Sequence, residues 1–233
     1  MKYKLLIILL LVIGVFTLLP HSSKDETKSG LAFKRDYEEI NGQENKNGKI
    51  HRAIELSEDN KFIEITTADL IKKIENEETF YVYFGSRLCP WCRSSIEMAD
   101  KISRDNNIEK IYYIDIWDDE GNEILRDKYA LNDDGELEVV IEKSEEYDKL
   151  LNFFDSLLEE YTLKDKEGKE VSVGEKRIYA PNYMYVEKGK AVRLVTGVSD
   201  KQEDSREELT DEMLEDEEKI FTEFFKNTCD DLC

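Results

Sequence analysis

Two cysteines separated by two residues, Cys89 and Cys92, are the side chains of this sequence best suited to chemistry. A Cys-x-x-Cys spacing occurs in two kinds of site, a dithiol that cycles with its disulfide and one half of a tetrahedral zinc site. Here the residues between the cysteines are Pro90 and Trp91. The motif alone is compatible with both kinds of site. The secondary structure around it indicates which of the two is present.

A buried strand and then a helix are expected around this pair. Residues 79–85 (TFYVYFG) form a continuous aromatic and β-branched run, which is typical of a central strand buried on both faces. Ile96, Ala99 and Ile102 are spaced for one apolar face of a helix. Pro90 suits the first turn of that helix because it gives up no N–H group that the helix needs.

A helix that begins at the cysteines favours redox chemistry. Unpaired backbone N–H groups and the helix dipole stabilise an anion there, and they can lower the pKa of a cysteine well below about 8.5. The thiolate formed in this way is the reactive species. Arg87 and Arg93 flank the pair, and they either add positive potential or serve as solubilising surface residues.

Length and charge narrow the class of protein. The 233 residues leave room for one ordinary domain together with an export segment and a linker, and 40% apolar residues are enough for a packed core. Asp and Glu number 54 against 33 Lys and Arg, a formal charge of −21. Such a surface repels phosphate backbones, so no binding of nucleic acid is expected.

Residues 1–23 have the pattern of a signal peptide or a signal anchor. Two lysines in the first four residues precede an uncharged apolar run over residues 5–19. The run is shorter than the roughly 20 residues that span a bilayer comfortably, which favours cleavage, whereas no clear Ala-x-Ala site is present, which favours an anchor. Either outcome predicts an extracytoplasmic chain, secreted or anchored in the membrane through residues 5–19.

The rest of the chain predicts a polar linker followed by an α/β domain. Residues 24–60 are polar with little periodicity, and His51 is interpreted as a solvated residue within this linker. The domain is expected over residues 61–228. Strands are predicted at 62–65, 79–85 and 110–116, with a helix capped by Thr67 and the cysteine helix between them. This βαβαβ order predicts a sheet with a parallel part.

The second half of the domain predicts further helices and a hairpin. Residues 123–131 are expected to form a short helix, and residues 132–176 form an acidic stretch with its own helix near 145–161. Strands over 182–186 and 191–196 form a hairpin, and a long acidic helix over about 205–226 suits docking against the sheet.

Several of these segments resemble the thioredoxin superfamily. The stretch from Phe80 to Arg93 (FYVYFGSRLCPWCR) is similar to the family's active-site strand and turn. Further resemblance lies in Lys128–Leu131 (end of the third helix), Ile178–Pro181 (the segment ending in a cis-proline), Lys188–Lys190 (a hairpin turn) and Gly197. The residues of this motif are most similar to those of small exported thioredoxin-like proteins, including those that accompany bacteriocin systems. The resemblance implies a thioredoxin-like three-layer fold with a central mixed sheet and a helical insertion, at about 132–176, before the cis-proline strand.

The resemblance also implies a mechanism without an organic cofactor or a metal. Cys89, the exposed first cysteine, would exchange disulfides with a protein substrate, and the more buried Cys92 would resolve the mixed disulfide. Pro181 would lie against the pair after a cis bond, and the backbone of Ala180 would pair with an extended substrate. Trp91 would cover the sulfur and contact substrate, or would only pack. The implied partners are exported proteins with cysteines and an unidentified redox partner.

Two departures from the family leave the direction of electron flow open. Tyr83 stands six residues before Cys89, where thioredoxins proper carry a buried acid that assists proton transfer to the resolving cysteine. The pair Pro90-Trp91 has no histidine that would favour a strong oxidant. Only the predicted extracytoplasmic location favours formation or rearrangement of substrate disulfides over their reduction.

A second cysteine pair, Cys229 and Cys233, has three interpretations: a local disulfide at a helix end, a second redox pair that exchanges with the first, or two ligands of a four-cysteine zinc site. The insertion at 132–176 either acts as a lid or platform for substrate or packs elsewhere. For the whole chain, the alternative to an oxidoreductase is a non-catalytic accessory or binding protein of a secretion or bacteriocin system.

Overall fold

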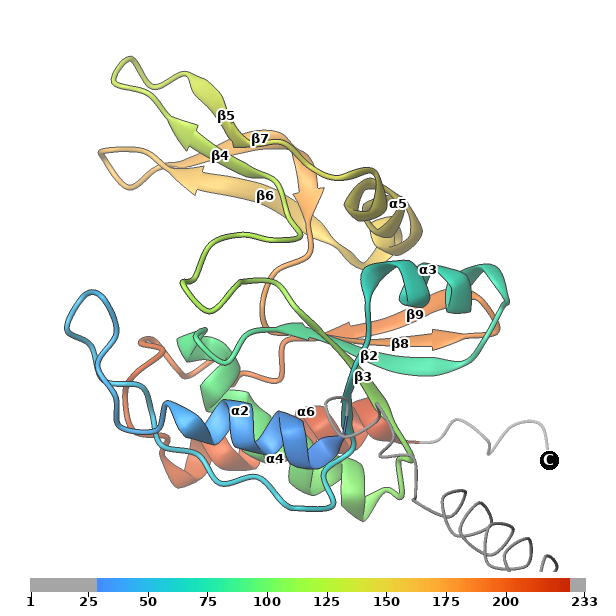
Figure 1. The fold of residues 1–233 in the computed structure, drawn as a ribbon. Coiled ribbons are helices and arrows are strands. Elements are labelled where there is room, and N and C mark those ends of the chain that lie inside the picture. The colour runs from blue at the N-terminus through green and yellow to red at the C-terminus, as the bar shows by residue number, and fades with distance from the viewer. Residues whose placement is uncertain (1–28, 227–233) are drawn as a thin grey trace, which may run out of the picture.

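A mixed five-stranded sheet forms the centre of the protein (Figure 1). The structure is a computed structural model that describes residues 29–226. In the order β1-β3-β2-β8-β9, the first three strands are parallel, β8 is antiparallel to β2, and β9 is antiparallel to β8. The strands are β1 (Phe62–Glu64), β2 (Phe80–Gly85), β3 (Ile111–Asp115), β8 (Asn182–Glu187) and β9 (Lys190–Val195). The predicted α/β class, the parallel part of the sheet and the hairpin are confirmed.

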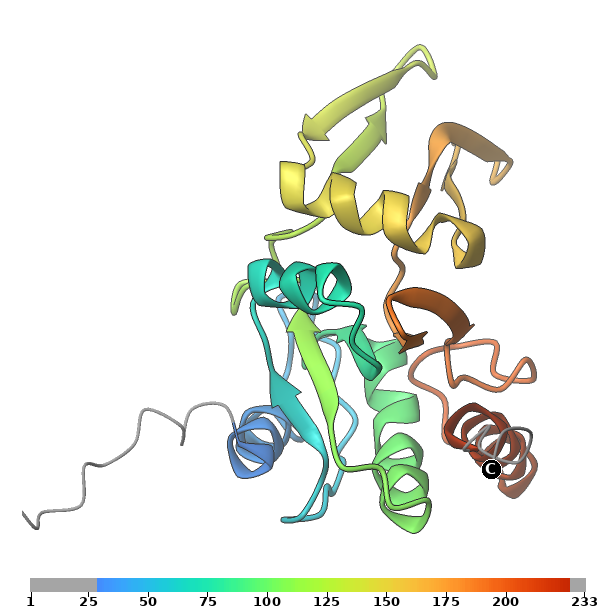
Figure 2. The ribbon, with the colours of Figure 1, turned by 90° about the vertical axis from the view of Figure 1, so that its right-hand side faces the viewer.

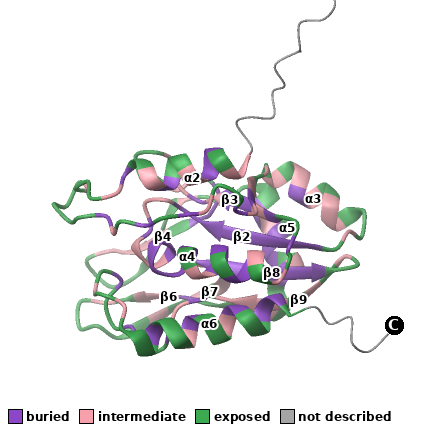
Figure 3. Ribbon diagram, turned by 90° about the horizontal axis from the view of Figure 1, so that it is seen from below, coloured by how far each residue is buried: buried purple, intermediate pink, exposed green. Residues whose placement is uncertain are grey.

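Helices cover both faces of this sheet (Figure 2). One face carries α2 (Gly30–Glu39), α4 (Pro90–Asp105) and α6 (Asp211–Phe225), and the other carries α3 (Thr67–Glu75) and α5 (Glu145–Phe154). All six residues of β2 are buried. Tyr81 and Tyr83 lie in the apolar cluster on the side of α2, α4 and α6, and Val82 and Phe84 lie in the cluster on the side of α3 and α5. Figure 3 shows β2 and β8 buried between the helices. The side chains of a central strand alternate between two cores, as the uninterrupted apolar run predicted.

The boundaries of two predicted helices need correction. The cap of α3 is Thr66 rather than Thr67, because the Thr66 side chain accepts a hydrogen bond from the N–H of Asp69. The last helix begins at Asp211 rather than near residue 205, after the cap Thr210. In both cases the hydroxyl that satisfies the first free N–H groups sets the start of the helix.

The prediction of a helix over residues 123–131 is wrong. Residues 128–131 form β4 (Lys128–Leu131), which pairs antiparallel with β5 (Leu137–Ile141) around a turn where Gly135 has a φ of 83°. The resemblance of this segment to the end of a helix is therefore wrong as well. Tyr129 packs edge-on against Tyr161 of the next hairpin, at 5.9 Å between ring centroids. Tertiary pairing of this kind overrides a local preference for helix.

The insertion is mixed rather than helical. Its helix α5 ends at Phe154 instead of near Tyr161, and a short 3₁₀ turn η2 (Asp155–Leu157) leads into the hairpin of β6 (Glu159–Lys164) and β7 (Glu170–Arg177). Both hairpins extend away from the central sheet, and α5 lies beside α3 (Figure 1). The insertion adds α5 to the core of the second face, where Tyr147 and Phe154 are fully buried.

Buried ion pairs join the loop before β4 to the end of β7, the last strand of the insertion. Arg177 binds Asp127 at 2.9 Å and Glu123 at 3.3 Å, and Arg126 binds Glu123 at 2.5 Å. Arg126 also donates to the carbonyl of Ile178 at 3.2 Å. The loop before β4 is thereby held next to the segment that reaches Pro181.

The prediction that residues 24–60 are a linker is wrong for the part that the structure describes. Helix α2 buries Phe33 and Tyr37 in the core, with 5% and 1% of their surfaces exposed, and Ile54 and Leu56 are buried further along. His51, expected to be solvated, is only 7% exposed. The sequence of this segment is mostly polar, so the apolar face of α2 was not recognised. That face becomes buried only when α2 packs on β1 and β3.

A buried arginine holds this segment in place. Arg93 is fully buried, although it was expected at the surface or as a source of potential at the site. It donates hydrogen bonds to the carbonyls of Tyr37 and Arg52 at 2.8 Å, to the carbonyl of Arg87 at 3.2 Å, and to the side chain of Asn41. One residue of α4 thus fixes the end of α2 and the loop after it.

The predictions for the two ends of the chain lie outside the described residues. These are the signal segment over residues 1–23 and the pair Cys229 and Cys233. Across residues 29–226, no helix has the length and apolar character needed to cross a membrane.

Two substitutions in α2 test whether this helix belongs to the core. We expect Phe33→Ala to lower the free energy of unfolding by about 3–5 kcal/mol, because Phe33 is buried and its ring stacks on Phe62 at 4.6 Å. Leu31→Ala, in the same helix but 56% exposed, should change it by less than about 0.5 kcal/mol. Urea unfolding measures both, and equal midpoints for the two variants would restore the linker interpretation.

Candidate redox site

The cysteine pair lies where β2 ends and α4 begins. Cys89 is the N-cap of α4, with an extended backbone, and its sulfur accepts a hydrogen bond from the N–H of Cys92 at 3.3 Å. Pro90 occupies the first helical position, as predicted. The free N–H groups that every helix start presents are therefore directed at the Cys89 sulfur.

Both cysteines are free and buried, and they lie 2.9 Å apart. Cys92 is fully buried, and Cys89 is only 3% exposed, so the expectation of an exposed first cysteine is wrong. The Cys89 sulfur lies 3.6 Å from the carbonyl oxygen of Ala180, to which the protonated thiol can donate. The segment that follows the insertion therefore covers the sulfur.

The surroundings shift the pKa values of the two thiols in opposite directions. A hydrogen bond from Cys92 lowers the pKa of Cys89, and the N–H groups of Cys92 and Trp91 and the guanidinium of Arg126 lower it further, against the effect of burial. Burial raises the pKa of Cys92, and the neighbouring Cys89 raises it more. Cys89 is thus the cysteine of the pair that loses its proton first, and the Cys92 thiol stabilises the resulting thiolate.

Neither flanking arginine has the predicted role at the site. Arg93 turns away toward backbone carbonyls, and Arg87 forms ion pairs with Asp119 at 2.8 Å and Glu39 at 3.4 Å. The cation that lowers the pKa of Cys89 is Arg126, which sequence reasoning missed. It lies 37 positions after the cysteine in a segment predicted to be a helix, so no local pattern pointed to it.

The predicted substrate-binding residues lie beside the pair. The peptide bond between Ala180 and Pro181 is cis, as the resemblance implied. Trp91 and Ala180 are partly buried and pack against the apolar cluster that contains both cysteines. Their binding of substrate stays a prediction, and Trp91 fits the packing interpretation as well as the binding one.

Four buried tyrosines surround the Cys92 thiol, and of these only Tyr83 was singled out from the sequence. The Tyr83 hydroxyl lies beside the Cys92 thiol and lowers its pKa, and it lies 3.0 Å from the hydroxyl of Tyr37. The Tyr83 ring stacks on Tyr183 and Tyr113, with centroids 4.4 Å and 5.5 Å apart. The alternation of β2 could have placed Tyr83 on the cysteine side of the sheet, but Tyr37 lies in the segment interpreted as a linker.

No metal centre is formed within residues 29–226, where no group of three or more His, Cys, Asp or Glu side chains is placed to hold an ion. No protein-family model matches the chain, and no curated protein sequence matches it.

Titration of the reduced protein tests the asymmetry of the pair. We expect the ultraviolet absorbance of thiolate to rise in two steps, one below and one above the ordinary pKa of cysteine, because Cys89 and Cys92 shift in opposite directions. In Cys92→Ala the lower step should move to higher pH, since the largest stabilisation of the Cys89 thiolate is lost. Cys89→Ala is the matched control and should retain only a high step. Two steps at the ordinary value would contradict the asymmetry.

Proposed function

We propose that this chain is an exported thiol–disulfide oxidoreductase of thioredoxin-like fold that exchanges disulfides with protein substrates through Cys89 and Cys92. The observation that carries the proposal is the pair itself: Cys89, the N-cap of a helix with a lowered thiol pKa, and the fully buried Cys92, 2.9 Å apart. The sheet order, with three parallel strands followed by an antiparallel hairpin, and the cis bond before Pro181 support the thioredoxin-like fold. The uncharged run over residues 5–19 supports export.

Exchange in the oxidising direction starts from the Cys89–Cys92 disulfide. A substrate thiolate attacks the Cys89 sulfur, the bond to Cys92 breaks, and Cys92 leaves as a thiolate that takes up a proton. A second substrate thiolate then attacks the substrate sulfur of the mixed disulfide, and Cys89 leaves as a thiolate. Two electrons have moved from the substrate dithiol to the cysteine pair. Reversal of the same steps reduces a substrate disulfide.

The lowered pKa of Cys89 supports the oxidising or rearranging direction. A thiolate of low pKa is a better leaving group, and it stabilises the reduced form of the pair, which raises the reduction potential. Ala180 and Pro181 are proposed to receive an extended substrate segment beside the sulfur, and Trp91 to offer it an apolar surface. The partners are exported proteins that carry cysteines, together with a redox partner that restores the disulfide.

Trapping of mixed disulfides tests the proposal. We expect Cys92→Ala, expressed as the full chain, to accumulate adducts with exported proteins that dithiothreitol releases, because Cys89 can attack but nothing resolves the bond. Cys89→Ala is the matched control and should trap none. If both variants behave alike and the double variant retains its cellular role, the protein is an accessory without redox activity.

The reduction potential of the pair tests the direction. We expect a value above the roughly −270 mV of thioredoxin and toward the roughly −120 mV of a strong oxidant, because the Cys89 thiolate is stabilised. Equilibration with glutathione buffers, followed by trapping of free thiols, measures it. A value at or below that of thioredoxin would make the protein a reductant.

A further inference from the structure

The buried position of Cys92 raises the question of where its proton goes. Cys92 is fully buried, and its thiol must lose a proton before the sulfur can attack a mixed disulfide. The polar groups beside it are therefore the only route within the described fold. This step exists only if the proposed function holds.

A hydrogen-bonded pair of tyrosines leads away from the Cys92 thiol. The Tyr83 hydroxyl lies beside the Cys92 thiol and 3.0 Å from the Tyr37 hydroxyl, and both tyrosines are at most 1% exposed. Gly85 makes room for this arrangement, because a Cβ atom there would lie 2.1 Å from the Tyr83 hydroxyl. A hydroxyl both donates and accepts, so two in series can pass a proton without either holding a charge.

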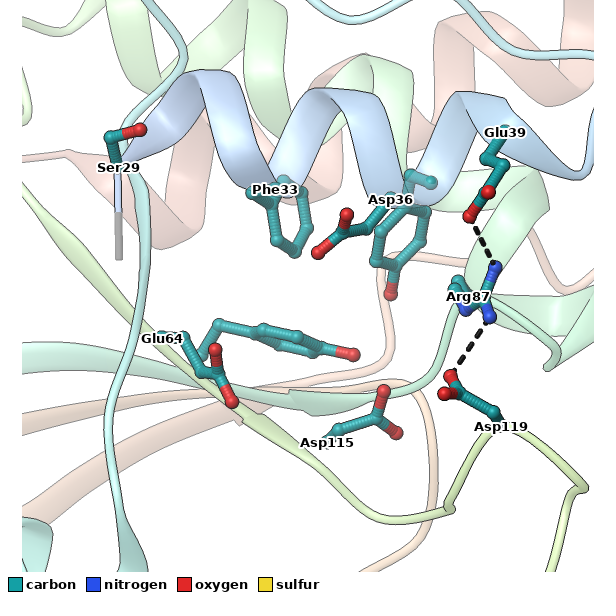
Figure 4. Close-up of a pocket in the computed structure, with 10 residues that line it drawn as sticks. Ser29, Phe33, Asp36, Glu39, Glu64, Arg87, Asp115 and Asp119 are labelled. Atoms are coloured by element: carbon teal, nitrogen blue, oxygen red, sulfur yellow. Dashed lines mark hydrogen bonds and ion pairs between the residues drawn. The ribbon is translucent and has the colours of Figure 1, made fainter. Parts of the chain in front are cut away.

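Tyr37, the second tyrosine of the pair, lines a cavity that reaches the surface. Figure 4 shows other residues that line this cavity. Tyr37, Tyr113 and Asp115 are among the residues that line this cavity, which has a volume of about 300 Å³, enough for several water molecules. Asp115 is partly exposed and points into it. Burial raises the pKa of the Asp115 carboxyl above its ordinary value, which makes the carboxylate a better proton acceptor.

We propose that Tyr83 and Tyr37 form a proton relay between the Cys92 thiol and Asp115 at the cavity. When Cys92 resolves a mixed disulfide, its proton passes to the Tyr83 oxygen while Tyr83 passes its own to Tyr37. Tyr37 passes a proton through the cavity to Asp115. The Cys92 thiolate then forms the bond to Cys89, and the substrate thiolate leaves. In the reverse direction the relay returns a proton to Cys92.

The branch through Tyr183 offers no exit to solvent, whereas Tyr113 lines the same cavity and leads to the same carboxyl, Asp115. Tyr183, on β8, bonds to Ser95 at 3.2 Å, and both residues are buried, so this branch stays inside the protein. Glu217 of α6 is fully buried near Tyr183, and burial raises its pKa to about 8. Tyr113 faces Asp115, and the Arg93 guanidinium faces Tyr37 and Tyr83 as a fixed positive charge.

A two-step reaction with a chromogenic aromatic disulfide separates the relay from the proposed function. Attack by Cys89 releases the first coloured thiolate, and resolution by Cys92 releases the second. We expect Tyr83→Phe to leave the first step unchanged and to slow the second about tenfold to a hundredfold at neutral pH, the effect of losing a hydrogen bond to a charged group. The pH profile of the second step should move to higher pH, because the hydroxyl that lowers the pKa of Cys92 is gone.

Three further variants define the route. Tyr37→Phe should also slow the second step. Asp115→Asn should slow the second step as well, and the rate of that step should no longer depend on the ionisation of the carboxyl at position 115. Tyr81→Phe is the matched control, since it removes a hydroxyl from the same face of β2 at a position that faces Arg193 instead of the cysteines. The second step in wild type should slow in D₂O more than it does in Tyr83→Phe, which a purely structural role of Tyr83 would not produce.

Each outcome decides a different question. If the wild-type chain releases no second thiolate, the proposed function fails and the relay with it. If wild type releases both and Tyr83→Phe, folded by circular dichroism, resolves at the wild-type rate, the relay is wrong and the function stands. If Tyr183→Phe slows the second step while Tyr37→Phe does not, the proton leaves toward Glu217, and the exit at Asp115 is wrong.

Discussion

The interaction on which the rest of the structure depends is the burial of the Arg93 guanidinium. A buried cation is costly unless its donors are satisfied, and Arg93 achieves this with backbone carbonyls and an amide side chain rather than a carboxylate. The acceptors come from α2, from the loop around Arg52 and from the turn before Cys89. One side chain therefore connects the N-terminal segment, the helix and the turn that present the cysteine pair. This connection reaches the cysteine pair through Tyr37, whose carbonyl accepts a hydrogen bond from Arg93 and whose hydroxyl lies 3.0 Å from that of Tyr83.

The sequence predicted the parts of the fold whose signals are local. The strand β2, the helix that begins at Pro90 and the hairpin of β8 and β9 follow from apolar runs and turn residues that lie close together in the chain. The parts that were missed depend on distant partners. Residues 128–131 become a strand because β5 and Tyr161 are available, and α2 joins the core because β1 and β3 complete its apolar face.

The same distinction applies to the site. Cys89, Cys92 and Pro90 were placed correctly by spacing, because a helix start directs its own N–H groups at its cap. Arg126, Tyr37 and the burial of Cys89 could not be predicted, since each depends on segments that the fold brings from distant parts of the chain. The resemblance to thioredoxins placed the cis bond at Pro181, which spacing alone would have left as an edge proline.

The presence of tyrosine rather than a carboxylate at position 83 has a physical reason. Tyr83 is fully buried among aromatic rings, where burial would strongly destabilise an ionised carboxylate. A phenol stays neutral there, because burial raises its pKa well above the ordinary value, and it still offers one donor and one acceptor. The charge that a proton acceptor needs is held at Asp115, which is partly exposed at the cavity. The side chain beside Cys92 is therefore neutral, and the carboxyl group of Asp115 lies away from it, at the cavity.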